Sequence, residues 1–465
     1  MTSSSDRPDG SAEEAGGEGP PKKNRFIVNV AKATGVRITL MVVNLTSALI
    51  LARIMGPEQY GIYIFAFAIM SLIALPGQAG LPSINVREIS FRIVDRDWAG
   101  VLGIVIFTRR LVLGYSLVAG TAILAVYWFF LSDWLSAEEA DAILWSALLI
   151  PAFILVNVTG ANIRGLKRLL LGQLVETLFR PVLFLGFILL LVFPFGQPLD
   201  ASSAMLMHAC GAGFALVISL IILRWILVPK SAGLTPTCDR RAILKSIAPL
   251  TMVAGMQLIL GKTDIMMLRV MRSPEEVGYY QVALQWANLA LFVHQAVLMV
   301  SGPSIARAYR KGDLVAVQRT LTASARLVFL GALPLGILLL FFGEEIIGMS
   351  FGAEYIPAVS ALSILLIARM VKASFGPIIQ LSKMLGWENL MFGLVTVSAL
   401  INVVLNYLLI PSYGIAGAAI AAVIADFFWK TALVGLAWWR LGLVSFPIGK
   451  GVQGNPSTPQ DEETK

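Results

Sequence analysis

Residues 51–81 read LARIMGPEQYGIYIFAFAIMSLIALPGQAGL, and a second version, LRVMRSPEEVGYYQVALQWANLALFVHQAVL, occupies residues 268–298. Laid over each other without a gap, the two segments agree at ten positions: Leu51/Leu268, Pro57/Pro274, Glu58/Glu275, Gly61/Gly278, Tyr63/Tyr280, Ala66/Ala283, Leu72/Leu289, Gln78/Gln295, Ala79/Ala296 and Leu81/Leu298. The same offset of 217 residues separates Pro194 from Pro411. A fixed offset indicates an internal duplication, so the chain divides into two similar halves.

The composition places the chain in a membrane. Of its 465 residues 57% are hydrophobic and 14% are charged, which is too few charges to cover a soluble globule of this size. The net charge of +8 does not indicate nucleic acid, because the cations fall in short loops between apolar runs. Two cysteines and two histidines provide neither a disulfide framework nor a metal site, so we expect no metal and no cofactor.

Twelve apolar runs of about 20 residues, each long enough to cross about 30 Å of hydrocarbon as a helix, lie between residues 28 and 438. They lack the alternation of barrel strands. The predicted fold is an all-α integral membrane protein with twelve transmembrane helices in two parallel six-helix repeats around a central cavity. We expect a disordered cytoplasmic tail (1–25), an N-terminal lobe (26–235), a C-terminal lobe (236–446) and a second cytoplasmic tail (447–465).

The distribution of lysine and arginine predicts the orientation. With the N-terminus inside, 28 of these residues fall in inner segments and three in outer loops, which predicts that both termini are cytoplasmic. Two parallel halves of six helices form a cavity that can open to either side of the membrane. No outer loop exceeds about 17 residues, which disfavours an enzyme that joins or polymerises sugars on that face.

Three phrases of the sequence resemble one transporter family. LARIMGPEQYGIY (51–63), FGAEYIPAVSALSILL (351–366) and LIPSYGIAGAAIAAV (409–423) resemble bacterial polysaccharide flippases, the Wzx-type branch of the multidrug/oligosaccharidyl-lipid/polysaccharide superfamily. The resemblance covers about residues 26–440. It implies that the chain flips a polyprenyl-pyrophosphate-linked oligosaccharide across the bacterial inner membrane by alternating access, for a surface polysaccharide such as O-antigen (lipopolysaccharide), capsule or exopolysaccharide. It supplies no catalytic residues.

Charges inside the predicted helices need partners, because each costs roughly 2.5 to 3.5 kcal/mol at the centre of a membrane helix. Glu176 with Arg180, and Asp426 with Lys430, are each spaced i, i+4, which predicts two ion pairs along helix faces.

Arg369 and Lys372 are spaced i, i+3 on the tenth run, with no acid on the same helix. They either pair with Glu176 or Asp426 from other helices, extend to the cytoplasmic side, or contact a pyrophosphate or an acidic sugar. In the seventh run, Lys262 and Asp264 are about 200° apart on a helix, so at most one of them points directly into the cavity.

The eighth run carries amides at helical spacing, and we expect them to share one face: Gln281, Gln285, Asn288 and Gln295. Arg37 and Asn44 form a weaker counterpart in the first run. These residues either line the cavity, where amides match sugar hydroxyls, or join helices to each other. His294, one residue off the face, is either a proton-coupled switch or a packed neutral histidine.

These patterns support two functional hypotheses. For the flippase, the predicted substrate-binding residues are Arg37, Asn44, Lys262, Gln281, Gln285, Asn288, Arg369 and Lys372, and the ion-coupling candidates are Asp264 and His294. The alternative is an ion-coupled multidrug or metabolite antiporter of the same superfamily, whose cavity should be rich in acids. Gly261-Lys262-Thr263 lacks the preceding glycine of the phosphate-loop motif Gly-x4-Gly-Lys-Ser/Thr, so that motif does not occur and we expect coupling to an ion gradient. We expect a monomer in contact with membrane lipid, with a polysaccharide polymerase and glycosyltransferases as candidate partners.

Overall fold

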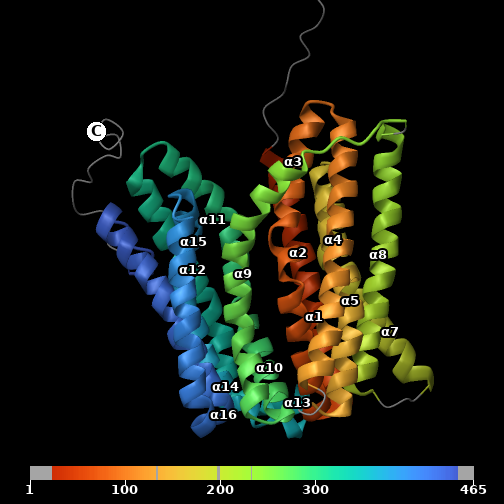
Figure 1. The fold of residues 1–465 in the computed structure, drawn as a ribbon. Coiled ribbons are helices and arrows are strands. Elements are labelled where there is room, and N and C mark those ends of the chain that lie inside the picture. The colour runs from red at the N-terminus through yellow and green to blue at the C-terminus, as the bar shows by residue number, and fades with distance from the viewer. Residues whose placement is uncertain (1–22, 132–134, 196–198, 232, 449–465) are drawn as a thin grey trace, which may run out of the picture.

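The structure is a computed structural model that describes residues 23–131, 135–195, 199–231 and 233–448 (Figure 1). Within these ranges the regular structure is helical, and they contain no β-strand. This confirms the predicted all-α class. The predicted tails, residues 1–25 and 447–465, lie almost wholly outside the described ranges.

The helices form two groups that lie side by side in Figure 1. The first group, which we call the N lobe, consists of α1 (Lys23–Ile73), α2 (Leu75–Ala79), α3 (Leu81–Val94), α4 (Trp98–Val126), the π-helical turn η1 (Tyr127–Leu131), α5 (Ala137–Gly165), α6 (Leu169–Thr177), α7 (Phe179–Phe195) and α8 (Ala201–Ser231). The second group, the C lobe, consists of α9 (Arg240–Met271), α10 (Pro274–Leu289), α11 (Phe292–Arg310), α12 (Leu314–Phe341), α13 (Gly343–Ser350), the 3-10 turn η2 (Ala353–Tyr355), α14 (Ala358–Ser374), α15 (Ile378–Met384) and α16 (Glu388–Leu441).

Two of these helices are each a pair of spans joined at a glycine. Gly56 in α1 has φ 74° and ψ 173°, and Gly414 in α16 has φ 53° and ψ −130°. A residue with a Cβ is strained at such positive φ values, so glycine is required where the chain reverses without leaving the helical run. The runs of 51 and 54 residues therefore account for the first two and the last two predicted spans.

The remaining helices agree with a multi-pass membrane protein. Among the described residues, six helices are long and apolar enough to cross a membrane, or eight if the bent pairs α6–α7 and α14–α15 each count as one span. Dividing α1 and α16 at their glycines adds two more. The other predicted spans, the seventh and the eighth, correspond to α9 and to α10–α11. The helices are consistent with the twelve predicted spans.

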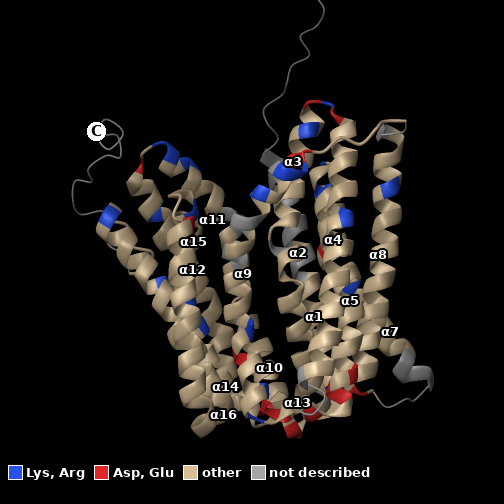
Figure 2. Cartoon of the chain, viewed as in Figure 1, with Lys and Arg blue, Asp and Glu red and all other residues tan. Residues whose placement is uncertain are grey.

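The two ends of the bundle carry opposite charge (Figure 2). At the basic end, α3, α5 and α11 finish with cations in their last turns: Arg92, Arg164, Arg307 and Arg310. At the acidic end, α5, α10 and α13 begin with acids in their first turns: Glu138, Glu139, Glu275, Glu276, Glu344 and Glu345. Acids at helix N-termini also interact favourably with the helix dipole.

The lobes contact each other most closely at the acidic end, where α1 meets α10 (Figure 1). The buried Tyr355 hydroxyl of η2 donates to the carbonyl oxygen of Ala52 in α1 over 2.9 Å. Arg269 of α9 forms an ion pair with Glu139 of α5, and its Nη2 donates to Oε2 over 2.7 Å. This interface therefore combines buried aromatic packing with a charge pair between the lobes.

Candidate functional site

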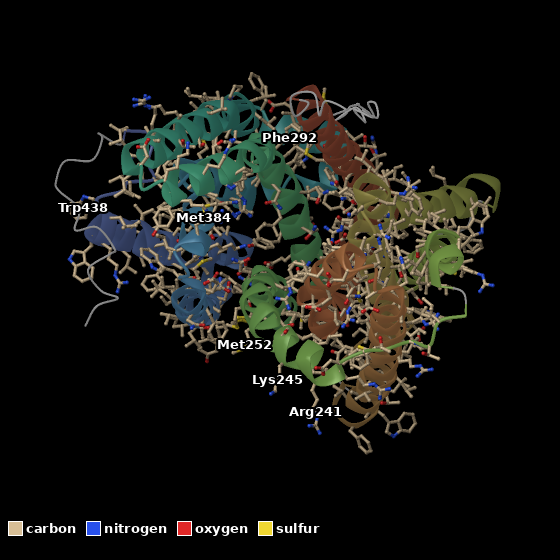
Figure 3. All side chains as sticks on the ribbon, turned by 90° about the horizontal axis from the view of Figure 1, so that it is seen from above. Arg241, Lys245, Met252, Phe292, Met384 and Trp438 are labelled. Atoms are coloured by element: carbon tan, nitrogen blue, oxygen red, sulfur yellow. The ribbon has the colours of Figure 1, made fainter. Side chains whose placement is uncertain are left out.

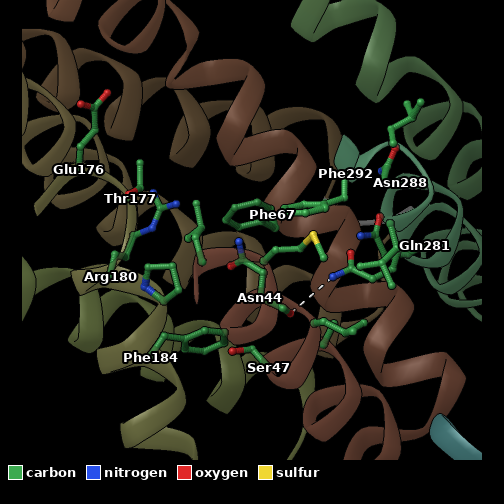
Figure 4. A pocket seen from close by; sticks show the side chains of 18 of the residues that line it. Asn44, Ser47, Phe67, Glu176, Thr177, Arg180, Phe184, Gln281, Asn288 and Phe292 are labelled. Carbon is green, nitrogen blue, oxygen red and sulfur yellow. Dashed lines mark hydrogen bonds between the residues drawn. The ribbon is translucent and has the colours of Figure 1, made fainter. Parts of the chain in front are cut away.

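A cavity of about 1140 Å³ lies between the lobes. Helices α1 and α5–α8 line it from the N lobe, and α9–α11, α14 and α15 line it from the C lobe. Figure 3, a view from above, shows the two groups of helices, with Lys245 and Met252 of α9 along their junction. Figure 4 shows Arg180 and Phe184 approaching the pocket from one side and Gln281 and Asn288 from the other.

The structure places most of the residues predicted for the site in this one cavity. The lining includes seven of them: Asn44, Lys262, Gln281, Gln285, Asn288, His294 and Lys372. Arg369 and Asp264 are not among the lining residues. The side chain of Arg37 lies outside the described part of the chain.

The amides of α10 lie on one helix and face the cavity. Gln285 Nε2 lies 3.5 Å from the carbonyl oxygen of Asn44 in α1, so an amide of the C lobe reaches the N lobe (Figure 4). The prediction of one continuous polar face as far as Gln295 was wrong, because α10 ends at Leu289 and α11 begins at Phe292. His294 lines the cavity from α11, while the side chain of Gln295 is not described.

Lys262 and Asp264 point in different directions, as the helical angle predicts. Lys262 lines the cavity, and its Nζ lies 5.6 Å from the centroid of the Phe67 ring. Asp264 is buried inside the C lobe and accepts hydrogen bonds of 2.9 Å from the Tyr280 hydroxyl and from two amide side chains of α16, Asn402 and Asn406. These three hydrogen-bond donors offset the free energy that burial of the Asp264 carboxylate would otherwise cost.

The predicted pair between Glu176 and Arg180 does not form. Glu176 Oε2 instead lies 2.7 Å from Arg164 Nη2 at the end of α5. The i, i+4 rule holds only along a continuous helix, and the chain bends by 41° between α6 and α7, which carry Glu176 and Arg180 respectively. Close packing of α5 on α6 at Gly160, where a Cβ would lie 2.8 Å from the Gly172 carbonyl oxygen, brings Arg164 within reach.

Arg180 is therefore a cation of the cavity that sequence analysis assigned to a structural pair. Its guanidinium carbon lies 3.7 Å from the centroid of the Phe153 ring, a cation–π contact. Its Nε and Nη1 are buried, and neither has a hydrogen-bond partner among the described residues. Buried donors without partners are rare in proteins, so this guanidinium is positioned to receive an anion.

The other predicted pair, Asp426 with Lys430, is confirmed: Lys430 Nζ donates to Asp426 Oδ1 within α16. Lys372 Nζ lies 4.0 Å from Asp426 Oδ2 and also lines the cavity, so it has both an acidic neighbour and access to a substrate. Arg369 Nε is buried and has no hydrogen-bond partner within the described ranges.

His208 of α8 is a second lining residue that sequence analysis missed. Its Nδ1 lies 2.9 Å from the Tyr63 hydroxyl, and its ring stacks on Phe184 with 4.2 Å between centroids. His208 lies in an apolar run without polar neighbours at helical spacing, so the sequence contains no periodic signal that could have indicated it.

Among the charged residues of the lining, cations predominate. Its described residues include four cations: Arg164, Arg180, Lys262 and Lys372. The one acid among them, Glu176, pairs with Arg164. The positive charge of three cations therefore remains without an acid within the lining, next to amides and aromatic rings. Such a site favours an anionic ligand that also carries hydroxyl groups.

The chain is similar to known membrane transporters in sequence and in fold. The chain is similar to the probable low-salt glycan biosynthesis flippase Agl15 of Haloferax volcanii, with 23% identity over 391 residues, 80% of this chain and 75% of the relative. Its fold is similar to an inward-facing MATE family multidrug resistance transporter of the MOP superfamily (TM-score 0.69, 17% identity, 88% of this chain and 98% of that one). It is also similar to the lipid II flippase MurJ in an inward closed conformation (TM-score 0.68, 14% identity, 86% of each chain).

At these identities the two solved structures establish a shared fold. The family follows from the sequence itself, because residues 29–309, more than half of the chain, match the family described as "Polysaccharide biosynthesis protein". The chain therefore belongs to the polysaccharide biosynthesis protein family and has the fold of MOP superfamily transporters.

Proposed function

We propose that this protein flips a polyprenyl-pyrophosphate-linked oligosaccharide from the cytoplasmic to the outer face of the plasma (inner) membrane, for the synthesis of a surface polysaccharide. The observation that carries the proposal is the cationic lining of the cavity between the lobes. A pyrophosphate with a sugar head cannot cross about 30 Å of hydrocarbon unaided, because its charges and hydroxyls would lose their hydrogen bonds to water.

Each group in the lining has a role in this proposal. Arg180 and Lys262 approach the cavity from opposite lobes and, with Lys372, offset the charge of the phosphates. The amides of α10 and Asn44 exchange hydrogen bonds with sugar hydroxyls, which act as donors and acceptors alike. Arg37 and Arg369 remain candidates for the phosphate on the strength of the sequence. The ring of Phe292, which lines the cavity and is only half-buried, offers an apolar face against which a sugar ring can pack.

We further propose that lobes 26–235 and 236–446 rock against each other in an alternating-access cycle. We assign the basic end to the cytoplasm by the positive-inside rule, and in the proposed orientation both chain termini are cytoplasmic. The inter-lobe contacts of Tyr355 and Arg269 lie at the acidic end, which corresponds to the outer face. This conformation would then be closed to the outside and ready to receive a substrate from the cytoplasm.

Labelling of single cysteines tests this orientation. In a background with Cys210→Ala and Cys238→Ser, an impermeant maleimide added to cells should label cysteines at Ala137 and Ala353 and should not label one at Arg241. Labelling at position 241 from outside would reverse the proposed orientation.

For the driving force we propose an ion gradient. Asp264, inside the C lobe, and His294, in the cavity wall, are the groups proposed to exchange an ion during the cycle. The hydrogen bonds of Asp264 join α9, α10 and α16, so a change in its charge would alter the packing of three helices.

The competing function is an ion-coupled multidrug or metabolite antiporter, which the structural likeness to a MATE family transporter favours. A cavity that binds organic cations should offer unpaired acids or a predominance of aromatic faces. Here the one acid among the described lining residues is already paired with Arg164. The two functions are therefore distinguished by the charge of the substrate.

The test is a deletion strain with leaflet-specific labelling of the glycan on extracted lipids. The flippase function predicts that polyprenyl-pyrophosphate oligosaccharide accumulates on the cytoplasmic side and that a surface polysaccharide is lost. Complementation with the wild-type chain should restore both. Unchanged glycolipid distribution and surface polysaccharide, together with greater sensitivity to cationic drugs, would favour the antiporter instead.

A further inference from the structure

A second hollow, which we call the lateral groove, lies at the junction of the lobes and has a volume of about 670 Å³. Helices α1, α2 and α4 line it from the N lobe, and α9 and α16 line it from the C lobe. Its described lining residues include no charged side chain and are apolar apart from Tyr115 and Thr263. Its size lies in the range of about 300 to 1,000 Å³ that is typical of ligand pockets.

The two polar side chains of the groove direct their hydroxyl groups to the backbone. The Tyr115 hydroxyl donates to the carbonyl oxygen of Ile73, and the Thr263 hydroxyl donates to that of Ile259 over 2.8 Å. The walls therefore present hydrocarbon and methionine sulfur to an occupant, and methionine side chains adapt readily to irregular apolar shapes. The groove suits an apolar chain better than a polar head.

The lateral groove and the central cavity share two walls, α1 and α9. On α1, Phe67 faces the cavity and Leu72 faces the groove; on α9, Lys262 faces the cavity and its neighbour Thr263 faces the groove. Consecutive residues of a helix point about 100° apart, so α9 presents a cation to one side and an apolar surface to the other. The change from cationic to apolar lining thus occurs at the seam between α1 and α9.

The position of the groove along the helices places it in the hydrocarbon region. Thr263 lies eight residues before the end of α9 at Met271, or about 12 Å from the acidic end. Tyr115 lies 17 residues after the start of α4 at Trp98, or about 26 Å from the basic end. Val403 and Ile259 are 43% and 39% exposed at the surface of the protein, where lipid chains have access to them.

We propose that the lateral groove binds the polyprenyl chain of the lipid carrier while the pyrophosphate and the sugars occupy the central cavity. The inference rests on the proposed function and deepens it by giving the tail a site on the protein. A lipid with an anionic head and a long apolar tail fits this arrangement, because its head can contact the cations of the cavity while its tail lies in the apolar groove on the other side of α1 and α9. Binding of the tail would orient the first phosphate toward Lys262.

Photocrosslinking tests the site directly. A benzophenone amino acid replaces Met267 in the full-length protein, which is reconstituted into phospholipid vesicles containing a trace of radiolabelled polyprenyl phosphate. The expected result is a radiolabelled adduct, despite the large excess of phospholipid. The matched control places the same amino acid at Val217, which is 56% exposed on α8 and does not line the groove, and should capture phospholipid alone. Phospholipid adducts alone at both positions would overturn the proposal.

A groove-filling substitution tests the consequence for transport. Thr263→Trp should lower the rate of flipping of a polyprenyl-linked oligosaccharide roughly tenfold to a hundredfold, because displacement of the tail misplaces the head group, while Val217→Trp should flip at the wild-type rate. If Thr263→Trp flips at the wild-type rate and no radiolabelled adduct forms at position 267, the groove does not bind the tail, and the flippase function is unaffected. Failure of the wild-type protein to flip any polyprenyl-linked glycan would refute the flippase function itself.

Discussion

Gly61 and Gly278, equivalent positions of the two halves 217 residues apart, pack against each other's helix across the lobe interface. A Cβ on Gly61 would lie 1.8 Å from the carbonyl oxygen of Pro274, and a Cβ on Gly278 would lie 2.4 Å from that of Pro57. Each distance is too short for any side chain, so the absence of a side chain at both positions allows α1 and α10 to cross at backbone contact. Small residues serve this purpose widely in membrane helices.

The first prediction concerns this crossing. Gly61→Ala should separate α1 from α10 and favour the conformation that is open at the acidic end. In the background without native cysteines, a cysteine at the cavity residue Leu51 should then react faster with an impermeant maleimide from the acidic-end side. Gly435→Ala is the matched control, because no heavy atom lies within 4 Å of a Cβ there. An unchanged labelling rate in the Gly61 variant would show that the crossing does not control opening.

The second prediction concerns the ion pair between Arg269 and Glu139, whose side chains are 15% and 1% exposed. Glu139→Gln should lower the free energy of unfolding by about 3 to 5 kcal/mol, because it removes the negative charge from a largely buried ion pair. Glutamine can also occupy this position of a capping box, so the cap that Glu139 forms with Ser136 is preserved.

A double-mutant cycle isolates the contribution of this pair. The double variant Glu139→Gln/Arg269→Gln should lose less stability than the sum of the losses in the two single variants, as measured by thermal unfolding in detergent. The more exposed pair Arg87–Glu88 is the control, and Glu88→Gln should change stability by about 1 kcal/mol or less. Additive effects at positions 139 and 269 would contradict a coupled pair.

The third prediction concerns Arg180. Arg180→Gln should reduce transport roughly tenfold to a hundredfold, the equivalent of a charge-assisted hydrogen bond of about 1.5 to 3 kcal/mol. The thermal stability of this variant should stay the same or rise, because it lacks a buried guanidinium of which two nitrogens have no hydrogen-bond partner among the described residues. Arg224→Gln, an exposed cation of α8, should leave both quantities unchanged. Equal loss of stability and transport would assign Arg180 a structural role.

The fourth prediction concerns Asp264. Asp264→Asn should make transport in vesicles insensitive to an imposed ion gradient, because the residue can no longer change charge. It should also lower stability by about 1 to 3 kcal/mol, since an amide group replaces one acceptor oxygen among three donors. Asp141→Asn, at an exposed position of α5, is the isosteric control. A wild-type response to the gradient in Asp264→Asn would exclude this carboxylate from coupling.

The equivalence of Gly61 and Gly278 illustrates what could be read from the sequence. The repeat offset identified both residues as a matched pair, and the helical angle separated Lys262 from Asp264. The tertiary structure was needed to show that the matched glycines pack at one crossing. It was also needed to find the two asparagines of α16, Asn402 and Asn406, that hold Asp264, because they lie 138 and 142 residues away from it in sequence.

The sequence by itself determined the duplication, the helical class, the membrane setting and the Asp426–Lys430 pair. These depend on local periodicity and on the requirement that backbone groups in lipid are satisfied within their own helix. The tertiary structure alone decided that Glu176 pairs with Arg164 and that Arg180 lines the cavity without an acidic partner. It alone also showed the apolar groove beside the central cavity. The physical reason is that a bend between two helices and the crossing of distant ones reorient side chains, and neither is encoded in the spacing of residues along a straight helix.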